Sequence, residues 1–425
     1  MATEKRLICD PKTGDSYYHI RHASGLDIFV MEMPGFTGSY AAFGTHYGSV
    51  HTDFISPSGE KARDPMGIAH FLEHKLFENE ECDAYELYAE TGANANAYTS
   101  FDKTVYLFEC TDNFNDSLKI LLESVTSPYF TDRSVEKEQG IIAQEILMCE
   151  DNPFRRVYFN LLKAAYHTHP VREEIAGTVG SISHIDKDTL YRAHEAFYDL
   201  SNMILCCSGN CNIDSIIAVA DEVLKPAKNT APKLVNCDEP RGVYQKRITE
   251  KMAVGLPMFA IGYKADPDEG VELCRKEYIS AFLLDMIFGQ TSRFYKENTE
   301  NGLINSRFET ETNSGDGFLI NIISGESKDP DRVLEIMNLE IGRIKREGLD
   351  QGEFDALKKT AYGSAIRGFN NVAACSSVML ESHMRGYDAY EPSRIIASIT
   401  LDEVLSSIDD LLDTERTCIS VITGE

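Results

Sequence analysis

The stretch Gly67–Phe77 constrains this chain more than any other, because it reads Gly-Ile-Ala-His-Phe-Leu-Glu-His-Lys-Leu-Phe. If the stretch is helical, His70, Glu73 and His74 are three and four residues apart and share one helix face. Two imidazoles one turn apart can bind a single zinc ion, and a carboxylate between them can reach a water at the metal. A proline start signal and an apolar opposite side predict a helix over about Pro65–Asn79.

The same pattern also has an ordinary explanation. In a chain of this composition, His-x-x-Glu-His arises by chance in on the order of one sequence in fifty. Two histidines on an amphipathic helix are also compatible with a plain surface or core position. A zinc site needs a third protein ligand, which must come from another part of the sequence. The motif alone is therefore a hypothesis.

The length of the chain, 425 residues, predicts two domains of roughly 200 residues each. Hydrophobic residues make up 43% and charged residues 26%, a balance typical of a globular protein. The net charge of −27 argues against a nucleic-acid partner, because few basic side chains would face the phosphates. An acidic surface that favours solubility explains this charge without selecting a substrate.

The lack of a visible targeting signal and the pattern of cysteines predict a cytoplasmic protein. No apolar segment of a secretory signal follows Met1–Arg6, and no apolar run approaches the roughly 18 residues of a membrane span. The eleven cysteines are scattered, and Cys207 and Cys211 have no second pair to complete a zinc ribbon. We therefore expect reduced thiols and no membrane partner.

Short apolar runs separated by glycine and polar breaks predict how secondary structure alternates along the first half. The expected strands are 26–30, 40–45, 103–110 and 202–208, and the expected helices are 84–91, 114–127, 135–150, 154–166 and 187–197. Gly92 should end the helix 84–91, and Thr131 or Ser134 should cap the helix 135–150.

The second half repeats this rhythm. Residues 185–208 begin with Ile-Asp-Lys-Asp-Thr-Leu and continue through a helix into a strand, and residues 399–423 do the same from Ile-Thr-Leu-Asp-Glu-Val. An internal duplication of one α+β unit is the simplest explanation. A proline-containing stretch separates the halves, so we predict domains over 1–225 and 244–425 with a linker at 226–243.

Glu145 is the candidate for the third zinc ligand. It lies in a predicted helix, and Glu138, seven residues earlier, shares its helix face and could brace it. Three other glutamates are alternatives: Glu78, Glu86 and Glu90. They lie too close in sequence to the first helix to reach the same metal easily. On spacing alone, an acidic helix face exposed to solvent explains Glu145 equally well. We expect His167 and His169 to be structural or to support the ligands.

Five segments together resemble the pitrilysin/insulinase family of zinc metallopeptidases, the inverzincins. The segment with the His-x-x-Glu-His signature is Asp64–Phe77. The others, in chain order, are Gly92–Ser100 with Asn-Ala-Tyr-Thr-Ser, Glu136-Lys137-Glu138 continuing to Glu145, His169-Pro170 with Gly177-Thr178, and Ser292-Arg293-Phe294-Tyr295. Chance does not supply five such segments in order over nearly the whole chain. The sequence looks like a short two-domain bacterial member, similar to the zinc-bearing subunit of a paired peptidase.

The resemblance implies a role for each matching residue near the motif. His70, His74 and Glu145 would bind one zinc ion per chain. Glu73 would be the general base, taking a proton from a water at the metal and returning it to the leaving amine. Glu138 would not bind the metal itself but would hydrogen-bond to a ligand and orient it.

The resemblance also implies a fold and a substrate strand. The fold is a pair of similar α+β domains, each a mostly antiparallel sheet flanked by helices, in agreement with the duplication. Asn96 and Ala97 would open an edge strand to which an extended peptide adds.

One segment departs from the family pattern. After its second-domain helix the family usually shows an Arg and, just past Gly-Leu-Ala, a Tyr, which hold the substrate at the scissile bond. Here Asn298 or Thr299 stands at the Arg position and Asn305 at the Tyr position. We therefore predict a related partner chain that supplies the Arg and the Tyr. A homodimer would complete the four-domain chamber of the family, but both copies would lack these residues.

We expect a zinc-dependent endopeptidase that hydrolyses peptides or unfolded polypeptide segments, as the catalytic subunit of a heterodimer. Two alternatives stay open: a non-catalytic scaffold subunit that retains the zinc site, and a structural zinc site with no open coordination position. Glu73 argues against the scaffold, because it has no evident structural role on a zinc face. The sequence does not specify the peptide, the cleavage preference, or whether the enzyme clears peptides or matures a precursor.

Overall fold

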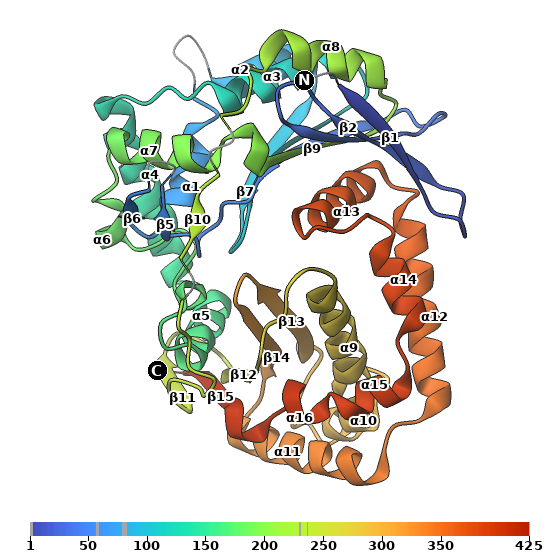
Figure 1. Ribbon diagram of the computed structural model, residues 1–425. Coiled ribbons are helices and arrows are strands. Elements are labelled where there is room, and N and C mark those ends of the chain that lie inside the picture. Colours follow the sequence, from blue (N-terminus) through green and yellow to red (C-terminus); the bar gives the residue numbers. More distant parts are fainter. Residues whose placement is uncertain (1–2, 57–58, 79–82, 229–230, 236, 425) are drawn as a thin grey trace. The chain divides into compact units, whose positions relative to one another are not determined.

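The computed structural model describes residues 3–56, 59–78, 83–228, 231–235 and 237–424. The chain divides into two compact units, each built on its own β-sheet (Figure 1). Unit 1 comprises Met1–Ile146, Glu174–Val235 and Ala365–Glu391, and unit 2 comprises Leu147–Glu173, Asn236–Ser364 and Pro392–Glu425.

The main sheet of unit 1 has the strand order β1-β2-β3-β9-β4-β8-β7, and only the β3–β9 pair is parallel. Its strands are β1 (Glu4–Cys9), β2 (Ser16–Arg21), β3 (Asp27–Glu32), β4 (Ser39–Thr45), β7 (Asn94–Thr99), β8 (Thr104–Cys110) and β9 (Met203–Gly209). A small sheet of order β10-β5-β6 contains β5 (Asp53–Ile55), β6 (Lys61–Arg63) and β10 (Lys233–Leu234). Strand β7 therefore forms one edge of the main sheet.

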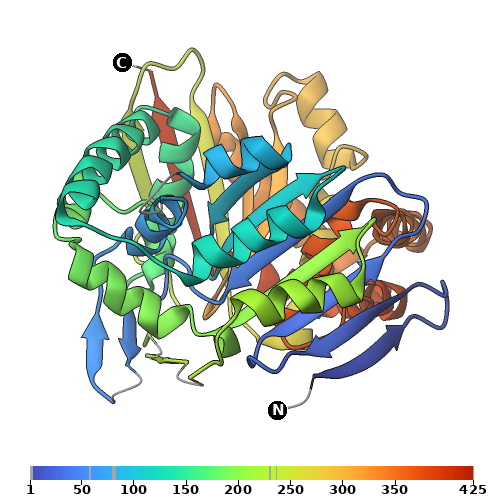
Figure 2. The same cartoon turned by 90° about the horizontal axis from the view of Figure 1, so that it is seen from above.

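Helices cover both faces of the unit 1 sheet. The core on one face joins the sheet to helices α1 (Ile68–Lys75), α2 (Ala84–Thr91), α3 (Phe114–Thr126), α4 (Asp132–Glu150), α7 (Lys187–Phe197) and α8 (Ile213–Val223), with the short α6 (Val179–Ile182) nearby. Helices α3 (teal) and α8 (yellow-green) lie across this face in Figure 2. The core on the other face joins the sheet to α13 (Val372–Met384). Along β4, Ala41 and Phe43 face the first core, whereas Tyr40 and Ala42 face α13, as the period of two requires.

Unit 2 has a five-stranded sheet of order β11-β15-β12-β14-β13, in which only β11–β15 is parallel. Its strands are β11 (Arg247–Lys251), β12 (Met258–Ala265), β13 (Glu309–Gly315), β14 (Phe318–Glu326) and β15 (Thr417–Thr423). Its helices are α5 (Pro153–Ala165), α9 (Gly270–Phe288), α10 (Arg293–Glu300), α11 (Pro330–Glu347), α12 (Gln351–Gly368), α14 (Glu391–Ser398), α15 (Leu401–Ser406) and α16 (Ile408–Leu411).

The two sheets have the same topology, which confirms the predicted α+β fold with an internal duplication. The order β3-β9-β4-β8-β7 in unit 1 corresponds to β11-β15-β12-β14-β13 in unit 2, and the single parallel pair falls in the same place. A short 3-10 helix precedes β9 and β15 alike, and its cap is Asp199 in one case and Asp413 in the other.

Each half of the sequence contributes one helix to the sheet of the other half. Helix α5, from the first half, packs on β12 and β15, and α13, from the second half, packs on the corresponding strands β4 and β9. A glycine makes room in each case: a Cβ at Gly44 would come within 2.7 Å of Met384, and a Cβ at Gly262 within 3.2 Å of Leu161. The compact units therefore differ from continuous domains over 1–225 and 244–425, and those boundaries stay a prediction about the sequence repeat.

The segment 226–243, predicted to be a linker, is fastened at several points where the structure describes it. Strand β10 pairs with β5, and the Lys228 amide donates to Asp199. In unit 2 the Glu239 carboxylate accepts hydrogen bonds from the amides of His167, Thr168 and His169.

Most predicted elements agree with the structure, and the differences have local causes. Helix α2 spans Ala84–Thr91 and ends at Gly92, as predicted. Helix α1 is shorter than predicted, because Gly67 has a left-handed φ of 91° and blocks extension toward Pro65; the predicted end at Asn79 lies outside the described residues. Helix α4 starts at Asp132 rather than 135, and the Thr131 hydroxyl accepts from the amide of Ser134.

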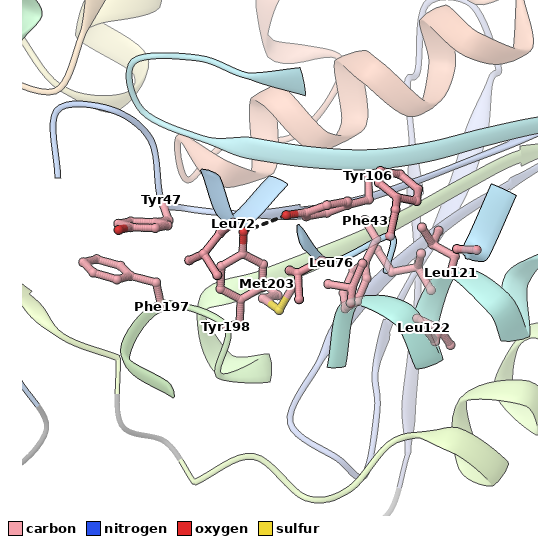
Figure 3. Close-up of a cluster of buried hydrophobic side chains, with 14 of the residues drawn as sticks. Phe43, Tyr47, Leu72, Leu76, Tyr106, Leu121, Leu122, Phe197, Tyr198 and Met203 are labelled. Carbon is pink, nitrogen blue, oxygen red and sulfur yellow. Dashed lines mark hydrogen bonds between the residues drawn. The ribbon is translucent and has the colours of Figure 1, made fainter. Parts of the chain in front are cut away.

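Aromatic side chains fill the unit 1 core beneath α1 (Figure 3). The Tyr47 and Phe197 rings stack with centroids 3.9 Å apart, and the Tyr106 and Tyr198 hydroxyls lie 2.9 Å apart. Leu72 of α1 and Leu76, which follows the end of the helix, enter the same cluster. In the described part of the chain, no helix combines the length and apolar character needed to cross a bilayer.

Candidate metal centre

Helix α1 divides its residues between the core and the site. Ile68, Phe71 and Leu72 are buried in the unit 1 core, while His70, Glu73 and His74 project from another side of the helix. The spacing of three and four residues that suggested a site therefore places the three polar side chains together. Donor atoms of these three residues all lie within 4.8 Å of one another.

Two glycines fix where α1 begins. A Cβ at Gly67 would lie 2.4 Å from the carbonyl oxygen of Ala176, and a Cβ at Gly177 would lie 2.5 Å from that of Met66. Both glycines also have a positive φ, a backbone conformation that is strained for residues with a side chain. The Ser181 hydroxyl donates to the Met66 carbonyl at 2.8 Å and closes this contact. The loop with Gly177, noted in the sequence as part of the resemblance, thus positions the helix that carries the histidines.

Helix α4 brings two carboxylates to these histidines. Glu145 Oε1 lies 3.5 Å from His70 Nε2, and Glu145 Oε2 lies 3.5 Å from His74 Nε2. Glu138 Oε1 lies 3.0 Å from His74 Nδ1. Because Glu138 and Glu145 are two turns apart, both face α1, as the sequence spacing predicts.

The contact with Glu138 sets the hydrogen position on His74. An ionised carboxylate only accepts, so Nδ1 is the donor to Glu138, and Nε2 is the ring nitrogen directed at Glu145. Burial lowers the pKa of His74, but the hydrogen bond to Glu138 and the charges of Glu73, Glu138 and Glu145 outweigh burial and leave the pKa raised. Burial raises the pKa of Glu138, whereas His74 and nearby lysines lower it below the usual range. On His70, Nδ1 is buried and has no hydrogen-bond partner among the described residues.

The donor set fits a zinc ion. Zinc bonds of roughly 2.1 Å in tetrahedral geometry separate neighbouring ligand atoms by about 3.4 Å. The two 3.5 Å separations between the imidazole nitrogens and the Glu145 oxygens agree with that spacing and are long for hydrogen bonds. Two neutral imidazoles and a carboxylate also form a ligand set that zinc takes in enzymes, with one position left open. His70, His74 and Glu145 could therefore hold the metal.

Glu73 lies beside this set with a different partner. The Thr99 hydroxyl donates to Glu73 Oε2 at 3.2 Å. Burial raises the pKa of the Glu73 carboxyl, while His70, His74 and Thr99 act in the opposite direction. A carboxylate beside a metal site can accept a proton and return it.

The other glutamates weighed as ligands are engaged elsewhere or exposed. The Glu78 carboxylate pairs with the buried Lys75 ammonium. Glu86 and Glu90 are exposed on α2. His169 lies in unit 2, where its Nε2 is 2.9 Å from the Asp316 carbonyl, and burial lowers its pKa.

The predicted substrate-binding residues lie on an edge strand. Asn96 and Ala97 belong to β7, which pairs only with β8 in the main sheet. Alternate residues of β7 are exposed, Asn96 among them, while Ala97 packs against the core.

The residues that depart from the family pattern lie in unit 2 and bond locally. Asn298 donates from Nδ2 to the Phe294 carbonyl of its own helix at 2.8 Å. Asn305 donates from Nδ2 to Glu326 Oε2 at 2.9 Å and accepts from the Arg307 amide. Both side chains are thus held by neighbouring groups in their own unit.

Thr99 was missed as a functional candidate from the sequence. It belongs to the Asn-Ala-Tyr-Thr-Ser segment that carried part of the resemblance, but nothing in the spacing relates it to Glu73, 26 residues earlier. Only the packing of β7 beside α1 brings the two side chains together.

Comparisons with known proteins agree with this geometry. Residues 58–179 match the model of the insulinase family (peptidase family M16), and residues 184–361 match that of the M16 inactive domain. The zinc protease YmfH of Bacillus subtilis is 36% identical over 409 residues, which is 95% of this chain and 95% of that protein. The chain belongs to the insulinase family, peptidase family M16.

Two further proteins are similar to this chain. A crystal structure of an M16-like peptidase from Alicyclobacillus acidocaldarius is 31% identical, with a TM-score of 0.92 over 100% of this chain and 99% of that one. The mitochondrial-processing peptidase subunit beta of Caenorhabditis elegans is 27% identical over 239 residues, which cover 53% of this chain and 49% of that protein. The M16 fold predicted from the motifs is therefore confirmed over the full chain.

Proposed function

We propose that this chain is a zinc-dependent endopeptidase that hydrolyses peptides or unfolded polypeptide segments. The observation that carries the proposal is the convergence of His70 Nε2 and His74 Nε2 on the two oxygens of Glu145, with Glu73 beside them. Membership of the M16 family and the zinc-protease name of the Bacillus subtilis relative support it.

Each residue of the site has one task in this reaction. A bound zinc would polarise the scissile carbonyl and a water at its open position. His70, His74 and Glu145 hold the ion, and Glu138 keeps the His74 ring oriented by accepting from Nδ1. Glu73 takes the proton of the attacking water and returns it to the leaving amine.

The edge strand β7 offers a way to hold the substrate. An edge strand exposes unpaired backbone N–H and C=O groups, to which an extended peptide can add as a further strand. Asn96 and Ala97 are central in β7, where the Asn96 side-chain oxygen accepts from the Ala97 amide, and Thr99 at the end of the strand bonds to Glu73. A peptide added to β7 would thus run along the strand that also bonds to the base. Such binding recognises the backbone, which suits unfolded segments of varied sequence.

The direct test measures metal and turnover together. The wild-type chain should bind one zinc ion and cleave an unfolded polypeptide such as reduced, alkylated casein, slowly when alone and faster with a partner chain present. Glu73→Gln should keep the zinc and lose turnover, because Glu73 acts on the water rather than on the ion. His70→Ala should lose the zinc. If Glu73→Gln lost zinc as completely as His70→Ala, these roles would be wrong.

We further propose that the chain is the catalytic half of a heterodimer. Two observations support this. Unit 1 carries all the proposed zinc ligands and the general base Glu73. Unit 2 has Asn298, Thr299 and Asn305 where the family usually has Arg and Tyr. A substrate displaced by about 1 Å can react on the order of 10²-fold more slowly. The Caenorhabditis elegans relative is named as one subunit of a processing peptidase, which is in keeping with a paired assembly.

Reconstitution tests the pairing. The chain alone, or as a homodimer, should be slow, and a related chain that carries the Arg and the Tyr but lacks His-x-x-Glu-His should restore turnover. Arg→Ala in that partner should abolish the restoration without preventing complex formation. Full turnover by the purified chain without a second polypeptide would contradict the heterodimer but not the peptidase.

A non-catalytic scaffold that retains zinc is the second candidate, favoured by the same Asn298 and Asn305. It predicts zinc binding without turnover in any pairing, and equal behaviour of wild type and Glu73→Gln. A structural zinc site predicts that no added anion reaches the metal. Turnover therefore separates the scaffold from the peptidase, and anion binding at the metal separates the structural site.

A further inference from the structure

Strand β7 presents three side chains toward the core beneath α1, at the period of two that a strand imposes. Ala95 and Ala97 are small and pack against the core, whereas Thr99 ends the row with a hydroxyl. Helix α1 packs on β7, and the Thr99 hydroxyl lies 3.2 Å from Glu73 Oε2. The polar position of this row is thus the one that meets the base.

The proton of the Thr99 hydroxyl has a defined acceptor. The neighbouring Thr104, paired with Thr99 across β7 and β8, donates its own proton to the Tyr47 carbonyl at 2.8 Å. The Thr104 oxygen lies farther from the Thr99 oxygen, at 3.4 Å. An ionised carboxylate is only an acceptor, so the Thr99 proton goes to Glu73. One carboxylate oxygen of Glu73 is thereby held, and the other remains available for water.

Glu73 needs such a restraint because of where it lies. Its carboxylate is within 4.8 Å of donor atoms of both His70 and His74, close enough that a rotation would let it bind the same metal. A fourth protein ligand would fill the open position that water needs and turn the site into a closed, structural one.

We propose that Thr99 is a positioning residue that holds Glu73 as a base and keeps it from becoming a fourth metal ligand. This inference rests on the proposed function, since it assumes that His70, His74 and Glu145 bind the metal. It also assigns β7 two tasks, because the strand offered to the peptide ends in the hydroxyl that orients the base.

A pair of substitutions separates the hydroxyl from the shape of the side chain. Thr99→Val keeps the shape and loses the donor, and Thr99→Ser keeps the donor. The proteins are loaded with Co2+, whose visible spectrum reports its ligands, and titrated with azide, a small anion that occupies an open metal position. Wild type and Thr99→Ser should respond to azide. Thr99→Val should bind Co2+ at least as tightly as wild type but respond to azide only weakly, because Glu73 fills the position.

Turnover gives the second reading. In the most active assembly available, Thr99→Val should lower kcat by about 10-fold or more, with KM little changed because the backbone of β7 still receives the peptide. Thr99→Ser should recover most of kcat. Damage of a merely structural kind would weaken metal binding instead, and serine would not cure it.

Thr45→Val is the matched control. Thr45 faces Thr104 from the neighbouring strand β4 and donates to the Phe197 carbonyl at 2.6 Å, so its loss removes a buried hydroxyl bond that does not involve Glu73. Its azide response should equal that of wild type. If Thr99→Val failed to fold, Thr99→Ala would provide the same test, with circular dichroism as the check on folding.

Three outcomes would overturn the inference. One is an unchanged azide response and kcat in Thr99→Val. Another is an equal loss of response in Thr45→Val, which would indicate general loosening. A wild-type chain that binds neither Zn2+ nor Co2+ would overturn the proposed function as well, whereas the first two leave that function intact.

Discussion

Five strands follow the same order in the two sheets, but the helices beside them carry different side chains. Between β4 and β7, unit 1 has α1 with its two histidines, whereas between the corresponding strands β12 and β13, unit 2 has α9, whose sequence contains no histidine. After β8, unit 1 has α4 with Glu138 and Glu145, and its counterpart after β14 is α12. The fold therefore does not specify the site. The candidate site depends on a few side chains of α1 and α4, which their counterparts α9 and α12 do not repeat.

The halves are alike, however, in how they exchange helices. Helix α5 lies on β12 and β15, and α13 lies on β4 and β9, at equivalent places. A glycine lies under each helix, Gly262 under α5 and Gly44 under α13. The halves thus differ in the side chains of α1 and α4, while the helices they exchange pack on equivalent strands.

The largest effect should come from the carboxylates of α4. Glu145→Gln should weaken zinc binding by more than 100-fold, because an amide is a poorer ligand than a carboxylate. Glu138→Gln should weaken it by about 10- to 100-fold, because it perturbs only the partner of His74. Competition with a chelator of known affinity measures both values.

Helix α12 supplies the control for this comparison. Glu353→Gln changes an exposed glutamate on the counterpart of α4 and should leave zinc affinity unchanged. If Glu138→Gln lost metal and Glu145→Gln kept it, the ligand assignment would be reversed. If Glu353→Gln also lost metal, the chemistry would not belong to unit 1 alone.

The parts of the structure that could be predicted from sequence depend on local spacing. The periodicity of α1 and α4 predicted that His70, His74, Glu138 and Glu145 lie on facing sides of two helices, and Gly92 marked the end of α2. The echoed helix and strand segments near the end of each half indicated the duplication.

What escaped prediction depends on contacts between distant segments. The Thr99 bond to Glu73 requires β7 to lie beside α1, and the Gly67 contact requires the loop at Gly177 to reach α1. The exchange of α5 and α13 could not be predicted from their sequences. An amphipathic pattern shows which face of a helix is buried but not which sheet it packs on.

A smaller effect should follow from filling the space under the exchanged helices. Gly262→Val should destabilise the protein by about 3 kcal/mol through overpacking, because Ile320 and Leu161 lie within 2.7 and 3.2 Å of the added Cβ and are fully buried. Gly44→Val should cost less, because the nearest atom is the flexible end of Met384. Urea unfolding monitored by circular dichroism gives both values.

The control for these variants is a helical glycine with open space around it. Gly363→Ala, in α12, meets no atom within 4 Å and should stabilise the protein by up to about 1 kcal/mol. If Gly44→Val and Gly262→Val were both neutral, the glycines would not be needed for the exchange of helices.

The smallest effect concerns how each unit fastens a distant segment with a buried lysine. In unit 1, Lys103 pairs with Glu381 of α13 at 3.1 Å, and in unit 2, Lys264 pairs with Glu239 of the segment 237–243 at 2.6 Å. The Glu381 side chain is 40% exposed and that of Glu239 only 9%. Glu239→Gln should therefore cost more, about 1.5 kcal/mol at neutral pH, than Glu381→Gln.

The pH dependence tests the unit 2 pair specifically. Burial raises the pKa of Glu239, but the hydrogen bond from Lys264 and the three amide donors of residues 167–169 outweigh it and lower the pKa from 4.5 to about 2. The folded state therefore binds the Glu239 proton less readily than the unfolded state does. The resulting stability is complete above pH 4.5 and is lost as the pH falls toward 2. Thermal unfolding followed from pH 7 to pH 2 should show a wild-type advantage over Glu239→Gln that shrinks across this window. A constant advantage at every pH would mean that the carboxylate charge contributes nothing and that only the shape of the side chain matters.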